Sequence, residues 1–156
     1  MQIEVITGQE RLTSPDAILE KLIAFYRAFN QGDMQLMRAN WEQSSEASMS
    51  NPLGGVKRGW PEIEAVYTRI FDGPARVYVE FYDYSLHQTD AMFIVAGRER
   101  GYLQRDAERL ELAIRTSRIY RKSAAGWQQL HHHGSIEKPE LLSQYQNAVM
   151  HGIFNK

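Results

Sequence analysis

Apolar residues near the start of the chain recur at the spacing of an α-helix. They fall at intervals of four, three and four residues, at Ile18, Leu22, Phe25 and Phe29. This spacing places them on one face of a helix that runs to Asn30. Ser14 followed by Pro15 favours a helix start, because a serine side chain accepts a free amide hydrogen bond and proline is tolerated in the first turn. Gly32 is expected to end the helix.

Two further helices are predicted before the middle of the chain. Asp33 can cap a short helix that runs towards Trp41, since its carboxylate also suits the positive end of the helix dipole. After a strand-like stretch at residues 47–51, residues 52–55 have the composition of a turn. A third helix is expected from Gly59 to Phe71, with apolar residues spaced for burial.

The pattern changes to β after residue 76. Aromatic and β-branched residues dominate four segments, at 77–86, 92–96, 110–120 and 127–133. The breaks between them are short and polar, so neighbouring strands should form antiparallel hairpins. A last helix is expected from Pro139. The predicted fold class is α+β, with a curved antiparallel sheet wrapped around the N-terminal helices as a cone, an α+β roll of the cystatin-like kind.

Size and composition fit one domain. The 156 residues suit a single core, which we place at residues 13–156, and residues 1–12 are predicted as either a short strand or a mobile tail. Eighteen basic residues nearly balance nineteen acidic ones, so no nucleic-acid partner is expected. No apolar stretch approaches the roughly 20 residues that span a bilayer, and the first eight residues lack a signal-peptide pattern. We therefore expect a cytoplasmic protein with no membrane partner.

The lack of cysteine limits the chemistry. It excludes disulfides, thiol nucleophiles and cysteine-ligated zinc, so function must rest on oxygen and nitrogen groups. No cofactor-binding motif is present, and none is predicted.

Two segments carry a family resemblance. Residues 25–33, Phe-Tyr-Arg-Ala-Phe-Asn-Gln-Gly-Asp, continuing to Trp41, resemble the first two helices of SnoaL-like and ketosteroid isomerase-like members of the nuclear transport factor 2 superfamily. Residues 116–121, Gly126-Trp127 and His131-His132-His133-Gly134-Ser135 are similar to the last two strands of the association domain of calcium/calmodulin-dependent protein kinase II. The resemblance covers about residues 16–135 and implies a cone with a pocket for a small molecule.

The isomerase residues of that superfamily are altered. Its Asp-Pro-x-Gly motif appears here as Asn51-Pro52-Leu53-Gly54, and an amide cannot act as the proton-transferring base. The family tyrosine falls on Phe25, and the protonated carboxyl donor falls near Thr116. The neighbouring Tyr26 can replace the lost hydroxyl only if the helix is rotated by about 100°. Isomerase chemistry of that kind is not predicted, but Asn51 is expected at the pocket mouth as a ligand-binding residue or as a turn residue.

Arg98 and Arg118 are the most informative charges, because both lie inside apolar strands. A hairpin symmetric about residue 108 would make them cross-strand partners, and like charges in that position repel. A negative group is therefore expected nearby, either Glu80 or an anionic ligand. The resemblance to the kinase association domain implies that both arginines face the pocket. The alternative is a structural ion-pair network with Glu80 or Glu99.

Three histidines in a row invite a metal or acid/base reading. Alternate strand residues point to opposite faces, so only His131 and His133 can act together. Two ligands are too few for a metal site, and none is predicted. The better interpretation is that one histidine is a buried hydrogen-bonding group and that another, His131 or His133, titrates in the cavity as an acid/base.

Aromatic residues are expected on both faces of the first long strand. Tyr78, Tyr82 and Tyr84 share one face of a regular strand, and Val77, Val79 and Phe81 share the other. This predicts helices on one side of the sheet and a homodimer partner on the other.

Two functional hypotheses follow. The first is a domain that binds a small, partly polar and anionic molecule and dimerises through its sheet, with candidate ligand-binding residues Asn51, Arg98, Arg118, Glu80 and Tyr120. The second is an isomerase, cyclase or lyase acting on a small ring compound, with His131 or His133 as the acid/base. A purely oligomerising module is a third alternative.

Overall fold

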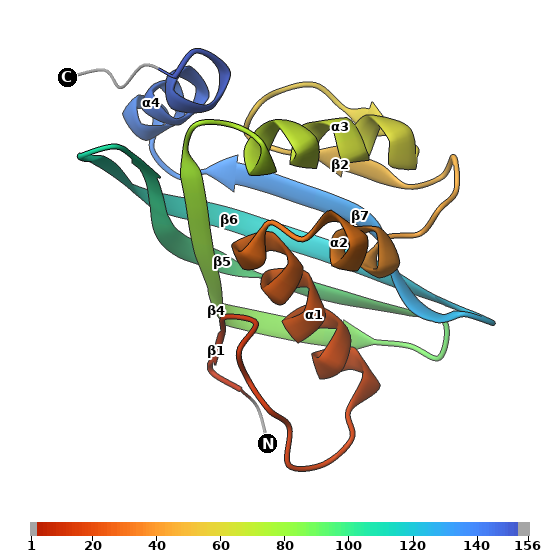
Figure 1. Cartoon of the computed structure of the whole chain (residues 1–156). Coiled ribbons are helices and arrows are strands. Elements are labelled where there is room, and N and C mark those ends of the chain that lie inside the picture. Colours follow the sequence, from red (N-terminus) through yellow and green to blue (C-terminus); the bar gives the residue numbers. More distant parts are fainter. Residues whose placement is uncertain (1–2, 153–156) are drawn as a thin grey trace.

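The computed structural model describes residues 3–152 and contains four helices and one seven-stranded sheet in that range (Figure 1). The helices are α1 (Ala17–Gln31), α2 (Met34–Asn40), α3 (Trp60–Phe71) and α4 (Pro139–Met150). The strands are β1 (Val5–Ile6), β2 (Ser48–Ser50), β3 (Lys57–Arg58), β4 (Arg76–Gln88), β5 (Met92–Arg105), β6 (Glu108–Ser123) and β7 (Gly126–Ile136). Their order across the sheet is β1-β4-β5-β6-β7-β2-β3, and only the β2–β7 pair is parallel.

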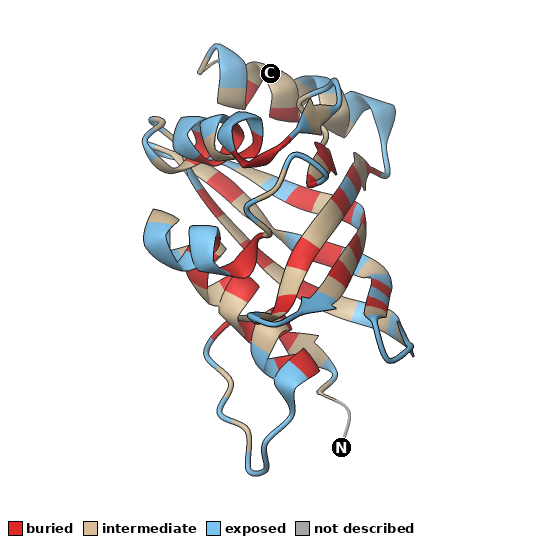
Figure 2. Cartoon of the chain, turned by 90° about the vertical axis from the view of Figure 1, so that its right-hand side faces the viewer, coloured by how far each residue is buried: buried red, intermediate tan, exposed pale blue. Residues whose placement is uncertain are grey.

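The sheet curves around the first three helices, which cover one of its faces, while α4 lies near one end of the molecule (Figure 1). Inward-facing strand positions are buried and alternate with exposed ones, as the stripes in Figure 2 show. The apolar face of α1 meets this inner surface, with Leu22 and Phe25 almost completely buried. The predicted α+β class, the helix order and the antiparallel meander are therefore confirmed.

The N-terminal segment forms a strand, one of its two predicted forms. Val5 pairs with Tyr82 and Ile6 pairs with Phe81 at the edge of β4. Ile6 is completely buried and belongs to the core. Residues 1–2 of the predicted tail lie outside the described residues.

Side-chain caps fix the start of the first two helices. The N-cap of α1 is Asp16 rather than the predicted Ser14, and its Oδ1 accepts hydrogen bonds from the amides of Ile18 and Leu19 at 3.1 and 3.0 Å. Asp33 caps α2 as predicted. Gly32 ends α1 with φ +63°, a left-handed conformation that suits glycine.

The β5–β6 hairpin is tighter than the sequence suggests. Arg105 pairs with Glu108 across a two-residue turn, so Arg98 pairs with Arg115 and not with Arg118. The predicted pairing of Arg98 with Arg118 is therefore wrong. Arg118 is three positions beyond Arg115, the partner of Arg98. Since alternate strand residues point to opposite faces, Arg98 and Arg118 lie on opposite faces of the sheet.

A β-bulge changes the face of one tyrosine. The β4–β5 register shifts between Tyr82 and Ser85, and Asp83 takes φ +48°. Tyr84 consequently turns inward, where its ring stacks on Phe81 at 4.9 Å and its hydroxyl donates a hydrogen bond to the carbonyl of Ile3 at 2.5 Å. The prediction that Tyr84 shares a face with Tyr82 is wrong, because strict alternation fails at a bulge.

Among the described residues, no helix has both the length and the apolar character that crossing a membrane requires.

Candidate functional site

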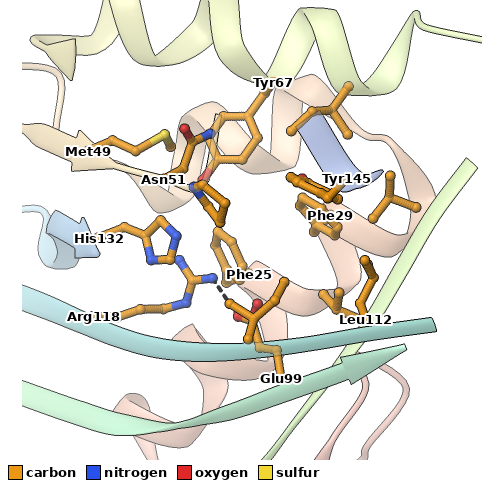
Figure 3. Close-up of a pocket in the computed structure, with 15 residues that line it drawn as sticks. Phe25, Phe29, Met49, Asn51, Tyr67, Glu99, Leu112, Arg118, His132 and Tyr145 are labelled. Carbon is orange, nitrogen blue, oxygen red and sulfur yellow. Dashed lines mark hydrogen bonds and ion pairs between the residues drawn. The ribbon is translucent and has the colours of Figure 1, made fainter. Parts of the chain in front are cut away.

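A small cavity lies between the inner face of the sheet and helices α1, α3 and α4 (Figure 3). Its volume is about 50 Å³, room for a few water molecules. Most of the wall is apolar or aromatic, with Phe25 and Phe29 from α1 and Leu112 from β6. Six side chains bring polar atoms to this wall: Asn51, Tyr67, Glu99, Arg118, His132 and Tyr145.

A buried ion pair forms the charged floor of the cavity. Arg118 Nη2 lies 2.9 Å from Glu99 Oε1, and the two side chains are only 3% and 6% exposed. Tyr26 donates its hydroxyl hydrogen to the same Oε1 at 2.7 Å. Among the described residues, no donor reaches the other carboxylate oxygen, Oε2, of this cavity-lining side chain. Glu99 therefore presents one free oxygen at the site.

Arg118 is held from three further directions. Its Nη1 donates to Gln129 Oε1 at 2.9 Å, its Nε donates to the Tyr26 hydroxyl at 3.4 Å, and its guanidinium lies 3.5 Å from the centre of the Phe25 ring. Burial opposes the charge, but the nearby Tyr26 and Glu99 outweigh it and raise the pKa of Arg118. Arg118 thus stays positively charged and fixed in position.

The network continues away from the cavity through buried amides. Gln129 Nε2 and the Tyr120 hydroxyl both donate to Asn40 Oδ1, at 3.3 and 3.0 Å. Tyr120 also stacks on Phe93, with ring centres 4.5 Å apart. Tyr120 therefore belongs to the support behind Arg118 and not to the cavity wall.

His132 lines the cavity and has one buried ring nitrogen without a hydrogen-bond partner among the described residues. That nitrogen is Nδ1, and the residue is 7% exposed. Burial, followed by the positive charge of Arg118, lowers the pKa of His132 well below its ordinary value. The imidazole is therefore neutral at pH 7 and has an unused polar atom in an otherwise well-bonded site.

Asn51 fixes a turn and also lines the cavity. Its Oδ1 accepts a hydrogen bond from the amide of Leu53 at 3.2 Å, which fixes the turn after β2. Its side chain also lines the cavity, and its amide nitrogen has no partner among residues 3–152. Asn51 can therefore donate to a ligand without leaving the turn.

The other predicted charges lie on the outer face of the sheet. Arg98 is 3.6 Å from Asp83 and 3.5 Å from Glu137, and its side chain is 52% exposed. Glu80 pairs with Arg100 at 2.6 Å instead of lying beside Arg98. The structure therefore brings Asn51 and Arg118 together at the cavity and leaves Arg98 and Glu80 outside it.

The two predicted histidines also face away from the cavity. His131 Nδ1 lies 2.7 Å from the hydroxyl of Ser48, and His133 is exposed beside an outer groove. The cause is an extra residue in β7: Ile119 pairs with His131 while Tyr120 pairs with Gln129, so Leu130 is bulged. Trp127 and Gln129 face inward, and the bulge then makes His132 the next inward-facing residue.

Among the described residues, no group of three or more histidine, aspartate or glutamate side chains is arranged to hold a metal ion.

Comparison with known proteins identifies the family. A model of the SnoaL-like domain matches residues 18–139. The chain belongs to the SnoaL-like domain family. No curated protein matches the sequence.

Solved structures share the fold of this SnoaL-like domain. A putative dehydratase of the NTF2-like family from Streptomyces avermitilis is 20% identical, with a TM-score of 0.69 over 78% of this chain and 94% of that one. A putative calcium/calmodulin-dependent protein kinase type II association domain from Thiobacillus denitrificans is 23% identical, with a TM-score of 0.65 over 76% and 93%. An NTF2-like superfamily protein from Salmonella enterica is 20% identical, with a TM-score of 0.70 over 78% and 89%. At these identities the similarity establishes the fold alone.

Proposed function

We propose that this SnoaL-like domain binds a small, mainly apolar and uncharged molecule in the cavity. The observation that carries the proposal is the unpartnered Nδ1 of the buried His132. A buried polar atom without a partner costs free energy of about 1–3 kcal/mol, and a ligand with one polar group removes that cost. The Asn51 amide supplies a second contact, and the apolar wall surrounds the rest of the molecule.

The charges of the cavity favour an uncharged ligand over the anion that the sequence suggested. Arg118 already has Glu99 as its counter-charge, and Arg98 lies on the other face. The neutral His132 adds no positive charge. An anion would therefore meet a paired arginine and the free oxygen of a carboxylate.

Phenol is a suitable probe, because it combines one aromatic ring with one hydroxyl group. Its ring is larger than the 50 Å³ cavity, so its binding requires the lining side chains to move apart. Histidine ring signals in NMR titrations report its binding. The His132→Phe variant keeps an aromatic ring and loses the polar atom, so phenol should bind about five to ten times more weakly, as expected for one hydrogen bond. The exposed His133→Phe variant is the matched control and should bind like the wild type.

Two outcomes contradict the proposal. One is no saturable binding of phenol to the wild-type protein, and the other is an equal effect of the two histidine variants. Native mass spectrometry of the purified protein provides an independent test, because a copurified small molecule and the subunit number appear in the same spectrum.

A second candidate function is proton transfer on such a ligand. Glu99 Oε2 has no donor among the described residues, and the neutral His132 lines the same cavity. A carboxylate that accepts a carbon-bound proton and an imidazole that donates to the adjacent carbonyl are the two parts of an enolising site. His132 thus takes the role that the sequence predicts for His131 or His133.

The test is deuterium incorporation. Cyclohexanone in D₂O should exchange its α-hydrogens faster with the wild-type protein than in buffer, and Glu99→Gln should abolish the difference. Exchange at the buffer rate with the wild-type protein would remove this second candidate and leave ligand binding untouched.

We also propose that two copies associate through the outer face of the sheet. Tyr78 and Tyr102 stack there at 5.4 Å, and the guanidinium of Arg109 lies 3.8 Å from the centre of the Tyr102 ring. Tyrosine and arginine are enriched in protein interfaces. Light scattering should give twice the monomer mass for the wild type and the monomer mass for Tyr102→Glu. A wild-type monomer at 100 μM would contradict the proposal.

A further inference from the structure

A second hollow borders the cavity. An open cleft of about 500 Å³ lies where α1 and α3 end and β4 begins. Phe29, Ile70 and Val77 line both hollows, so these three side chains form the wall between them. Ile70 and Val77 are each 8% exposed. A ligand that extends from the cavity into the cleft must displace these three side chains.

Aromatic rings connect the two spaces. Phe25 lies against the guanidinium of Arg118, and its ring centre is 6.2 Å from that of Phe29. Phe29 is in turn 5.9 Å from Phe71, which lines the cleft. Figure 3 shows Phe25 and Phe29 at increasing distance from Arg118. A ring-shaped or flat molecule can therefore contact aromatic surface from the ion pair to the cleft.

The cleft has different chemistry from the cavity. The last carbonyls of a helix have no partner within the helix, and both α1 and α3 end at the cleft. The carbonyls of Ala28, Phe29 and Thr68 already accept from backbone amides that follow the two helices, so the acceptors left for a ligand are the later carbonyls of each final turn. The exposed Arg76 adds donors, and it has no ion pair or side-chain hydrogen bond with any of residues 3–152.

We propose that the ligand is amphipathic, with an apolar ring in the cavity and an uncharged, hydroxylated end in the cleft. This inference rests on the proposed function. Hydroxyl groups suit the cleft because they donate to helix carbonyls and also accept from Arg76. The volumes agree: 50 Å³ is too small for a typical ligand, whereas cavity and cleft together reach the 300–1,000 Å³ of known binding sites.

Three matched probes test the proposal: phenol, phenyl β-D-glucoside and phenyl β-D-glucuronide. The glucoside adds a hydroxylated group to the ring, and the glucuronide differs from it by a carboxylate. The glucoside should bind the wild-type protein at least ten times more tightly than phenol and more tightly than the glucuronide. Arg76→Ala should weaken glucoside binding about fivefold and leave phenol binding unchanged. Arg58→Ala, at an exposed arginine of β3 that lines neither hollow, is the control and should change neither.

The position of each half of the probe is also measurable. Intermolecular nuclear Overhauser effects should connect the phenyl protons to Leu112 methyl groups and the sugar protons to Ala75, which line the cavity and the cleft respectively. Phenyl contacts confined to Ala75 would overturn the proposal.

The failures of the two proposals are distinguishable. Phenol binding that depends on His132, together with a glucoside that binds no better than phenol, overturns the cleft subsite and leaves the cavity proposal standing. A glucuronide that binds more tightly than the glucoside overturns the uncharged character of the cleft ligand. If phenol itself does not bind, the cavity proposal fails and the cleft subsite fails with it.

Discussion

The buried pair of Arg118 and Glu99 gives the sharpest test of the site. Replacing Glu99 with glutamine keeps the shape of the side chain and removes the counter-charge of the guanidinium. Arg118 is then left positively charged at 3% exposure, with neutral partners and aromatic rings around it. We expect the Glu99→Gln variant to lose about 3 kcal/mol of its free energy of unfolding.

The magnitude follows from the burial of both charges. At the effective dielectric constant of about 20 that suits protein sites, unit charges about 3 Å apart attract by about 6 kcal/mol. Part of this attraction is offset by the desolvation of two ions, so removing one partner of such a pair costs about 3–5 kcal/mol. The glutamine variant belongs at the low end, because its carbonyl oxygen can still accept from Arg118 and Tyr26.

Urea unfolding of a double-mutant cycle isolates the interaction. The cycle uses Glu99→Gln, Arg118→Met and the double variant, and a coupling of at least about 2 kcal/mol is expected. The neighbouring strand β4 offers a control in Glu80→Gln, which breaks the exposed pair with Arg100 at 2.6 Å. Water screens that pair, so the control should lose much less stability. Equal losses for Glu99→Gln and Glu80→Gln would refute the reasoning.

Three further predictions concern single positions. The folded-state pKa of His132 is depressed, so the unfolded chain binds the extra proton, and the wild type should lose about 1.4 kcal/mol of unfolding free energy for each pH unit below about 6.5 until folded His132 titrates. Urea titrations between pH 5 and 7 should show a shallower slope for His132→Phe, and an unchanged slope would contradict the assignment. Asp16→Ala should cost about 1 kcal/mol in thermal unfolding because it removes the cap of α1, whereas Ser14→Ala should cost almost nothing. Asp83 has φ +48°, so Asp83→Val should lose at least about 1 kcal/mol while Asp83→Gly should not, and equal stability of the two variants would exclude backbone strain.

Periodic features of the fold could be predicted from the sequence. The stripe from Ile18 to Phe29 identifies α1, because a helix that buries one face must repeat apolar residues every three to four positions. The long β segments and their short polar breaks likewise identify the meander. These patterns persist over many residues, so a local irregularity does not hide them.

Single-residue irregularities could not be predicted from the sequence, and they determine which side chains face the cavity. The turn between Arg105 and Glu108 sets the cross-strand partner of Arg98. The bulge at Leu130 directs His132 into the cavity, whereas strict alternation from Trp127 selects His131 and His133. A one-residue slip exchanges the two faces of a strand, and side-chain pattern alone does not reveal it where both faces carry polar residues.

Asn51 and Arg118 could be found from the sequence for different reasons. Asn51 stands in a turn motif with a family resemblance, and Arg118 is a charge inside an apolar strand. Glu99 lies between Arg98 and Arg100, so no apolar run distinguishes it, and the sequence predicts it as one alternative partner in an ion-pair network. Tyr26 reaches the ion pair without the helix rotation that its sequence position suggested, because the partner it meets is Glu99 and not a ligand.

The orientation of Glu99 has a consequence for ligand charge. A cavity with Arg118 alone would attract carboxylates, but an anion placed about 4 Å from the free Oε2 of Glu99 would be repelled by about 4 kcal/mol at an effective dielectric constant of 20. That repulsion offsets most of the attraction to an arginine at a similar distance. An uncharged ligand experiences neither effect and still gains the hydrogen bond to His132. Under the proposed function, the ion pair that holds Arg118 in place is therefore also the reason that the cavity should prefer neutral molecules.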